Sequence, residues 1–240
     1  MKKETIIRNM QNSSFRDNED VPVIDYINSI NNGQEITLLE VGSGECRFVR
    51  KIMNLYSNVR ITCIEINPDL GKIAEDLGCN VFVDNVLNVQ INEKYDIVHC
   101  SHVIEHFDYP AITEVLDFLC THVSANGRLI IRTPLLWEAF YYDIDHIRIY
   151  PPYAIINYFN YNQQQKKSKH NIIIEKIWYR TIPRRIEHIS TWHLVYAFKL
   201  TRRMINVIID KINILYEKLW NRYRWPSSKP NGYVAIIKCY

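Results

Sequence analysis

Short apolar segments alternate with helical patterns along this chain up to a polar stretch at 162–169. This alternation is typical of a parallel sheet whose strands are joined by crossover helices, so the sequence predicts an α/β fold. An Asn126-Gly127 pair is a common helix stop and turn, and we expect the fifth strand to begin after it. The predicted strands are 36–41, 60–65, 80–83, 95–100, 128–133, 172–182 and 233–239, and the predicted helices are 20–32, 48–56, 68–77 and 111–122.

The composition is ordinary for a soluble globular protein, with 47% apolar and 23% charged residues. No stretch approaches the roughly eighteen apolar residues of a spanning helix, and residues 1–4 do not begin a secretory signal. The six cysteines are scattered without a Cys-x-x-Cys pair, which indicates buried free thiols rather than a disulfide framework. We therefore expect a cytoplasmic protein, with association to a membrane surface as an open alternative.

Charge is divided unevenly along the chain. Residues 1–159 hold 13 basic and 22 acidic residues, a net charge of −9, whereas residues 160–240 hold 16 basic and 4 acidic residues, a net charge of +12. From Trp192 to Trp225 apolar residues recur at helical spacing among arginines and lysines, which predicts one or two amphipathic basic helices. We therefore expect an α/β domain at 1–186 and 230–240, with a basic helical insertion at 187–229 before the last strand.

A glycine turn, Gly42-Ser43-Gly44, joins the first predicted strand to the next helix. Glycine lets the backbone turn tightly and approach a ligand, and the following helix presents free N–H groups there. A dinucleotide-binding turn would have a third glycine where this chain has Arg47. Glu40, two residues before the first glycine, would repel a pyrophosphate, and it suits a cationic group of the ligand instead.

Acidic residues also close the second and third predicted strands. Glu65 can accept hydrogen bonds from both hydroxyls of a ribose, and Asp84 can accept one from the amino group of an adenine. The alternative is that each carboxylate caps the helix that follows its strand. Three carboxylates at three successive strand ends favour a binding site for an adenosine with a cationic substituent.

With these motifs and the segment 95–106 (YDIVHCSHVIEH), the chain resembles the class I S-adenosylmethionine (SAM) dependent methyltransferases. The resemblance implies a Rossmann-like seven-stranded sheet with its last strand antiparallel, SAM as cofactor and S-adenosylhomocysteine (SAH) as product. It also implies that Cys46, which stands where relatives often have a third glycine, points away from the cofactor. The residues it assigns to cofactor binding are Glu40, Gly42, Ser43, Gly44, Glu65, Ile66, Asp84, Asn85, Val86 and Ser101.

Two clusters that follow the fourth and fifth strands suggest how an acceptor is handled: His102-x-x-Glu105-His106 and the segment 143–151. In one hypothesis His146 or His102 is a general base, assisted by Asp145, because methylation of a hydroxyl requires loss of its proton. Segment 143–151 resembles branches of the family that modify sugars and surface glycans. This predicts an O-methyltransferase acting on a carbohydrate hydroxyl in surface-glycan or glycolipid biosynthesis. The residues expected to hold the acceptor are His106, Arg148, Tyr150 and Trp137.

In a second hypothesis His102, Glu105, His106 and His146 bind a divalent metal, because positions i, i+3 and i+4 share one face of a helix. The cluster resembles that of ubiquinone O-methyltransferases and of small-RNA 3′-terminal 2′-O-methyltransferases. The protein would then be a metal-assisted RNA ribose 2′-O-methyltransferase. Two alternatives remain open: a purely structural role for Glu105 and His106, and a non-catalytic SAM-binding scaffold.

The basic segment 190–225 fits three partners. An anionic membrane surface comes first, and it would place the protein beside a lipid-linked carbohydrate acceptor. A second copy of the chain, forming a homodimer, comes next. An RNA backbone is the third, and its binding would weaken steeply with salt.

Overall fold

The computed structural model describes residues 17–137, 139–160, 168–180 and 230–240, together with the single positions 207, 208, 211 and 215. The chain divides into two units, one of Met1–Arg180 with Asn231–Tyr240 and one of Thr181–Pro230. The predicted basic helices fall in the second unit, almost wholly outside the described residues, and they stay a prediction. Among the residues described, no helix has the length and apolar character needed to cross a membrane.

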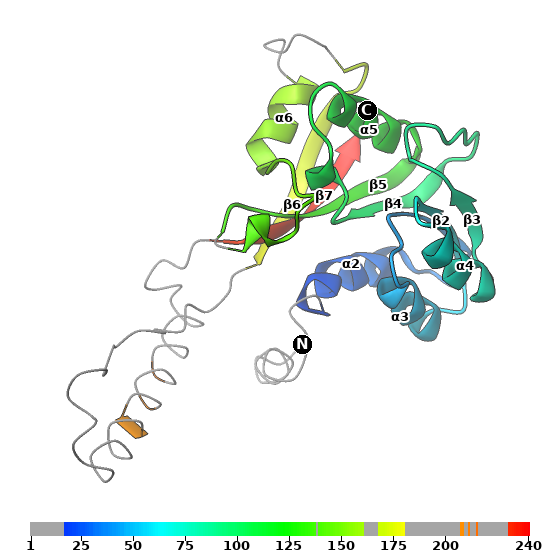
Figure 1. Ribbon diagram of the computed structural model, residues 1–240. Helices are drawn as coiled ribbons and strands as arrows, with labels where there is room; N and C mark the ends of the chain where they lie inside the picture. Colours follow the sequence, from blue (N-terminus) through cyan, green and yellow to red (C-terminus); the bar gives the residue numbers. More distant parts are fainter. Residues whose placement is uncertain are drawn as a thin grey trace. The chain divides into compact units, whose positions relative to one another are not determined.

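The first unit is built on one seven-stranded sheet with the strand order β3-β2-β1-β4-β5-β7-β6 (Figure 1). The strands β1 to β5 pair in parallel, and β7 runs antiparallel to both β5 and β6. This confirms the predicted sheet and its antiparallel last strand. The bounds are β1 Ile36–Val41, β2 Val59–Glu65, β3 Asn80–Val83, β4 Tyr95–Ser101, β5 Val123–Pro134, β6 Ile172–Arg180 and β7 Gly232–Cys239.

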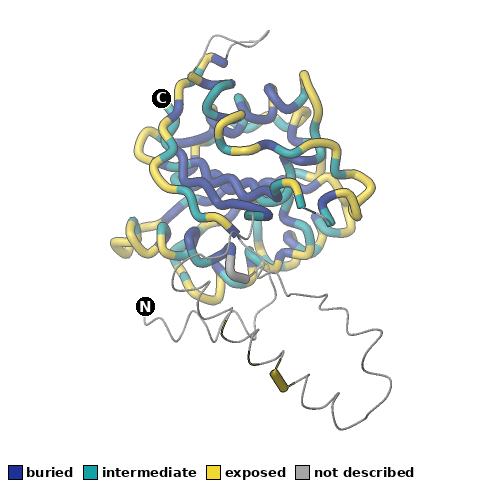
Figure 2. The backbone as a smooth tube through the Cα atoms, turned by 90° about the vertical axis from the view of Figure 1, so that its left-hand side faces the viewer, coloured by how far each residue is buried: buried dark blue, intermediate teal, exposed yellow. Residues whose placement is uncertain are grey.

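Helices cover both faces of the sheet, and the strands between them are buried (Figure 2). On one face, Val23, Ile27, Val49 and Ile52 of α2 and α3 pack with Ala74 of α4. On the other face, α5 and α6 contribute an equally apolar layer. The bounds are α2 Asp17–Ile30, α3 Arg47–Leu55, α4 Pro68–Asp76, α5 Ala111–Thr121 and α6 Pro152–Asn160, with short 3-10 turns η1 Ile104–His106 and η2 Phe140–Tyr142. The four predicted helices are present, whereas α6, η1 and η2 were not predicted.

The start of β5 differs from the prediction. The strand begins at Val123, and its pairing with β4 shifts register, since Tyr95 pairs with Val123 and Ile97 pairs with Arg128. The Asn-Gly pair therefore forms an irregularity inside the strand rather than a turn before it. Gly127 is required there because a Cβ would lie 2.7 Å from the carbonyl oxygen of Tyr95.

Candidate active site

The turn after β1 is shaped by close contact with the end of β4. Gly42 has a φ of 77°, and a Cβ at this position would lie 2.3 Å from Cγ2 of Val103. Its N–H donates to the carbonyl of Ile64 at 2.8 Å, which holds the turn against β2. Gly44 has a φ of 50°. The left-handed backbone and the lack of space explain the glycine at position 42.

Cys46 occupies the position before α3 in a left-handed conformation, with a φ of 58°. Its side chain is fully buried and packs in the apolar cluster beneath α2 and α3. The thiol therefore points into the core, as the resemblance implied.

A cavity of about 570 Å³ lies at the carboxyl ends of the central strands. It brings together five predicted cofactor residues with five predicted catalytic or acceptor residues. It also includes nine lining residues that the sequence analysis did not assign. The predicted ones are Glu40, Gly42, Ser43, Gly44, Ser101, His102, His106, Trp137, Asp145 and His146, and the unassigned ones are Asp20, Glu45, Arg47, Phe48, Arg132, Pro134, Ala139, Asp143 and Arg180.

Glu65 lies beside this cavity and is hydrogen-bonded to the glycine turn. Its Oε2 accepts from the N–H of Gly44 at 2.7 Å, and its Oε1 accepts from the N–H of Asn67 at 3.1 Å. The ends of β1 and β2 are therefore tied together by this carboxylate. Glu65 thus combines a structural bond to the turn with the position predicted for a ribose contact.

The residues predicted for the adenine side are not part of the lining of this cavity. Oδ1 of Asp84 accepts from the N–H of Asn85 at 2.6 Å and from Nδ2 of Asn88 at 2.9 Å, within the turn that follows β3. Ile66 is exposed, and Val86 is buried in the core with its side chain turned inward. The roles of Ile66, Asp84, Asn85 and Val86 in cofactor binding stay predictions.

His102 is held between two buried carboxylates. Its Nε2 lies 3.0 Å from Oε2 of Glu19 in α2, and its Nδ1 lies 3.3 Å from Oε1 of Glu105. Burial lowers the pKa of the His102 ring, but the bonds to Glu105 and Glu19 outweigh it and raise that pKa above its usual 6.5. Both ring nitrogens of His102 therefore face carboxylates. The roles of His102 as a general base or a metal ligand stay predictions.

The same Glu19 is the centre of a buried ion-pair network that the sequence analysis missed. Nη1 of Arg180 lies 3.0 Å from Oε1 of Glu19, and Nη1 of Arg132 lies 2.8 Å from Oδ1 of Asp20. Burial raises the pKa of Glu19, but His102 and the two arginines outweigh it and hold that pKa below its usual 4.5. The network fixes α2 to β5 and β6 at the wall of the cavity. In the sequence, this network is indicated only by Arg132 and Arg180, two charged residues within otherwise largely apolar strands.

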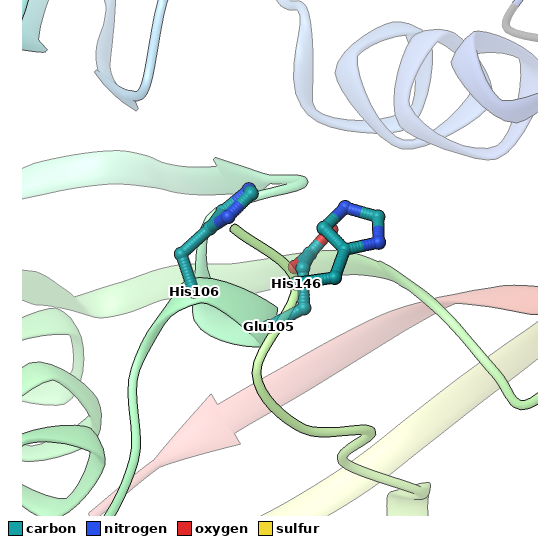
Figure 3. Close-up of side chains that lie close together, drawn as sticks. All are labelled: Glu105, His106 and His146. Atoms are coloured by element: carbon teal, nitrogen blue, oxygen red, sulfur yellow. The ribbon is translucent and has the colours of Figure 1, made fainter. Parts of the chain in front are cut away.

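His146 and His106 approach each other from the loop after η2 and from η1 (Figure 3). Nδ1 of His146 lies 2.6 Å from the carbonyl oxygen of Phe140, and Nδ1 of His106 lies 3.1 Å from that of Asp145. A carbonyl can only accept, so each Nδ1 carries a proton. In the neutral ring, Nε2 is then left with a lone pair.

The loop is fixed at Glu105. The N–H groups of Ile147 and Arg148 donate to the carbonyl of Glu105 at 2.9 and 3.2 Å. The predicted helical face is wrong, because η1 begins only at Ile104 and His102 precedes it with a φ of 57°. Glu105, His106 and His146 nevertheless each place one potential ligand atom within 4.8 Å of the others. Among the described residues, these three are the set that can hold a metal ion.

Arg148 and Tyr150 do not reach this cavity. Both line a second cavity of about 350 Å³ beside α5 and α6. Tyr150 is buried and donates its hydroxyl to the carbonyl of Phe107 at 2.7 Å, while the guanidinium of Arg148 lies over its ring. Arg148 and Tyr150 therefore lie apart from the cavity lined by His106 and His146, and their role in holding the acceptor stays a prediction.

Comparison with known proteins places this architecture in a family. Residues 15–194 match the family model described as Methyltransferase domain. A solved SAM-dependent methyltransferase from Archaeoglobus fulgidus is similar over 99% of this chain and 100% of its own, with 18% identity and a TM-score of 0.57. A coclaurine N-methyltransferase, solved with N-methylheliamine and SAH, is similar over 95% of this chain and 74% of its own, with 14% identity and a TM-score of 0.56.

The search of curated proteins gives no match to this chain. The two solved structures show the shared fold, and the family model covers most of the sequence. Glu40 and the glycine turn line the cavity at the carboxyl ends of the central strands, and Glu65 is bonded to that turn. The chain therefore belongs to the methyltransferase domain family and is a class I methyltransferase that uses S-adenosyl-L-methionine.

Proposed function

We propose that the enzyme methylates a hydroxyl oxygen of a carbohydrate acceptor, as in the assembly of surface glycans or glycolipids. The observation that carries the proposal is the fixed tautomer of His146 on the wall of the cavity. The carbonyl of Phe140 accepts a hydrogen bond from Nδ1–H, so the lone pair of Nε2 is available to a ligand in the cavity. A neutral imidazole so oriented is suited to general-base catalysis near neutral pH.

When bound, SAM supplies an electrophilic methyl carbon on a sulfonium. An acceptor hydroxyl must lose its proton as its oxygen forms the new bond to that carbon, and Nε2 of His146 takes the proton. Asp143 lies beside this nitrogen, with Oδ2 at 3.6 Å, and stabilises the charged ring that results. The methyl carbon–sulfur bond breaks, and SAH remains.

The residues that would hold the cofactor line one end of the cavity. The carboxylate of Glu40 would accept from its ammonium group, and the turn 42–44 would lie against its methionine part. Glu65, fixed by the N–H of Gly44, would accept from the ribose. These proposed contacts join the roles predicted from the sequence to the positions of Glu40, the glycine turn and Glu65 in the structure.

The acceptor end is polar and suits a small molecule with several hydroxyls. Asp143 and Asp145 expose their carboxylates at the cavity and can accept from hydroxyl groups. Trp137 adds an indole face, on which the apolar face of a sugar ring stacks well. An acceptor with many hydroxyl donors therefore fits this lining better than an apolar one.

The test is transfer of a radiolabelled methyl group from SAM to a panel of acceptors. The panel contains monosaccharides, nucleotide sugars, phenols, amines and a short RNA with a free 3′ end. The proposal expects a labelled sugar ether and loss of the label with His146→Ala. Transfer to amines or RNA alone would contradict it.

A second candidate function is favoured by the placement of Glu105, His106 and His146 (Figure 3). Two imidazoles whose Nδ1 groups donate to carbonyls, with one buried carboxylate, fit a borderline metal such as Zn²⁺ or Co²⁺. Such an ion would act as a Lewis acid toward a ribose hydroxyl in an RNA 2′-O-methyltransferase. Compared with the predicted set, His102 is not among the residues whose potential ligand atoms lie together here.

The two candidates differ in what they require of His106. A metal site needs both imidazoles, so His106→Ala would abolish Zn²⁺ binding in calorimetry and activity together. A general base at His146 needs no metal, so turnover would continue in metal-free buffer, and His106→Ala would weaken only the binding of the acceptor. Either result decides between the candidates.

A further inference from the structure

Glu40 forms a buried pair with a histidine to which the preceding sections assign no role. Oε2 of Glu40 lies 2.6 Å from Nδ1 of His99, which extends from the neighbouring strand β4. His99 is fully buried, and Glu40 is 2% exposed. Charged and polar side chains are rarely buried this deeply without a function or a structural bond.

The tautomer of His99 follows from its surroundings. Its Nε2 is buried with no hydrogen-bond partner. A proton there would add an unsatisfied buried donor, so the ring proton lies on Nδ1 and is donated to Glu40. The ring of Phe48, which lines the cavity, contacts the ring of His99 with the centroids 4.4 Å apart, and His99 itself is not part of the lining.

This bond fixes how Glu40 faces the cavity. The bond uses Oε2, while the Glu40 side chain also lines the cavity. Oε1 is then the oxygen left for a ligand. Without a donor at Oε2, a carboxylate under the glycine turn would be free to rotate and would carry an unpaired oxygen.

We propose that His99 is a positioning residue for the amino group of the cofactor, acting through Glu40. It orients the carboxylate so that one oxygen is held by the protein and the other accepts from the ammonium group. The proposal rests on the proposed role of Glu40 in the bound state. It assigns no contact between His99 and the cofactor.

Two variants of similar size separate the hydrogen bond from the packing. The amide nitrogen of His99→Asn can occupy the place of Nδ1 and keep the bond to Glu40. In His99→Gln the amide extends to the place of the unpartnered Nε2, and the bond is lost. His122→Gln is a matched control, since His122 is a buried histidine whose nitrogens bond only to the carbonyls of Phe118 and Ile91.

The measurement is the affinity of the full chain for two ligands by isothermal titration, with thermal unfolding as the check of folding. SAH carries the amino-acid part, and 5′-methylthioadenosine lacks it. We expect His99→Gln to lose about tenfold or more in SAH affinity, the range for a hydrogen bond to a charged group. Its affinity for 5′-methylthioadenosine stays unchanged, His99→Asn stays within about threefold for both ligands, and His122→Gln changes neither.

Equal losses for both ligands, or unchanged SAH affinity in His99→Gln, would overturn the proposal. If the glutamine variant does not fold, the asparagine variant must still keep full SAH affinity. A Glu40→Gln variant separates the role of Glu40 in cofactor binding from the role of His99 in positioning it. If Glu40→Gln binds SAH with normal affinity, Glu40 does not bind the amino group and both proposals fail. If Glu40→Gln loses SAH affinity and His99→Gln does not, only the positioning role of His99 is wrong.

Discussion

Nδ1 of His146 donates to the carbonyl of Phe140 over 2.6 Å, and this bond fixes which nitrogen of the ring can act as a base. The acceptor is a backbone carbonyl at the start of η2, six positions earlier in the chain, so the bond does not depend on which side chains the methyl acceptor contacts. The loop is itself held by the carbonyl of Glu105, next to the end of β4. The geometry at the centre of the proposed mechanism is therefore set by main-chain bonds.

The first prediction concerns this ring. His146→Ala should lower kcat by about 10²- to 10⁴-fold, the range for loss of a general base, and leave the affinity for SAH unchanged. Steady-state assays and calorimetry measure the two quantities. A variant with full activity would remove His146 as the base.

Glu65 links the glycine turn to the predicted ribose contact. Because its Oε2 accepts from Gly44, Glu65→Ala should lose both the ribose contact and a bond that shapes the turn. We expect SAH binding to weaken beyond detection, while circular dichroism shows an intact fold. Unchanged affinity would refute the assignment of Glu65 to the cofactor.

Gly42→Ala tests the shape of the turn. The added Cβ would meet Val103 at 2.3 Å and would be strained at a φ of 77°. We expect loss of SAH affinity and a destabilisation of about 1–3 kcal/mol in urea unfolding. Adding Val103→Ala removes the clash but not the backbone strain, so it should restore stability only in part. Full recovery in the double variant would show that the conformation of Gly42 imposes no constraint.

The raised pKa of His102 predicts a pH dependence of stability. When folding raises the pKa of a histidine, the protonated ring stabilises the folded protein, and this stabilisation is fully present below the unfolded pKa, here 6.5. The stabilisation is lost as the pH rises through the pKa of the folded state. The free energy of unfolding should therefore fall on the alkaline side of 6.5. The ring faces Glu19 and Glu105, and Arg132 and Arg180 face the same Glu19. His102→Gln should lack this slope in urea titrations across a pH series, and an identical slope would assign it to another group.

The basic segment gives a prediction that is independent of the cavity. Replacing residues 187–229 by a short Gly-Ser linker should abolish sedimentation with phosphatidylglycerol vesicles, because the segment carries the predicted cationic helices. Titration with SAH should give the same affinity as the full chain. An equal loss of SAH affinity would place the segment within the cofactor domain.

The strands and four of the helices could be predicted because apolar runs, glycines and strand-end acids are local signals. The 3-10 turn at η1 could not, since His102-x-x-Glu105-His106 has helical spacing and only the left-handed backbone of His102 breaks it. The helix α6 begins at Pro152 and was not predicted, although Ile155 and Phe159 of this segment are buried.

The site was predictable where it depends on neighbouring residues and not where it depends on distant ones. Glu40 and the glycine turn adjoin in sequence and line the cavity together. Glu19 meets Arg132 and Arg180 only because α2 packs against the far strands, and no local pattern encodes that contact. The burial of Tyr150 likewise depends on a distant contact, the hydrogen bond from its hydroxyl to the carbonyl of Phe107.

A crystal structure of the protein with SAH tests the central claim most directly. The account predicts the amino group of SAH at Glu40, the ribose hydroxyls at Glu65 and the sulfur facing the end of the cavity that holds His146. SAH bound elsewhere, or lying with its sulfur away from His146, would contradict it.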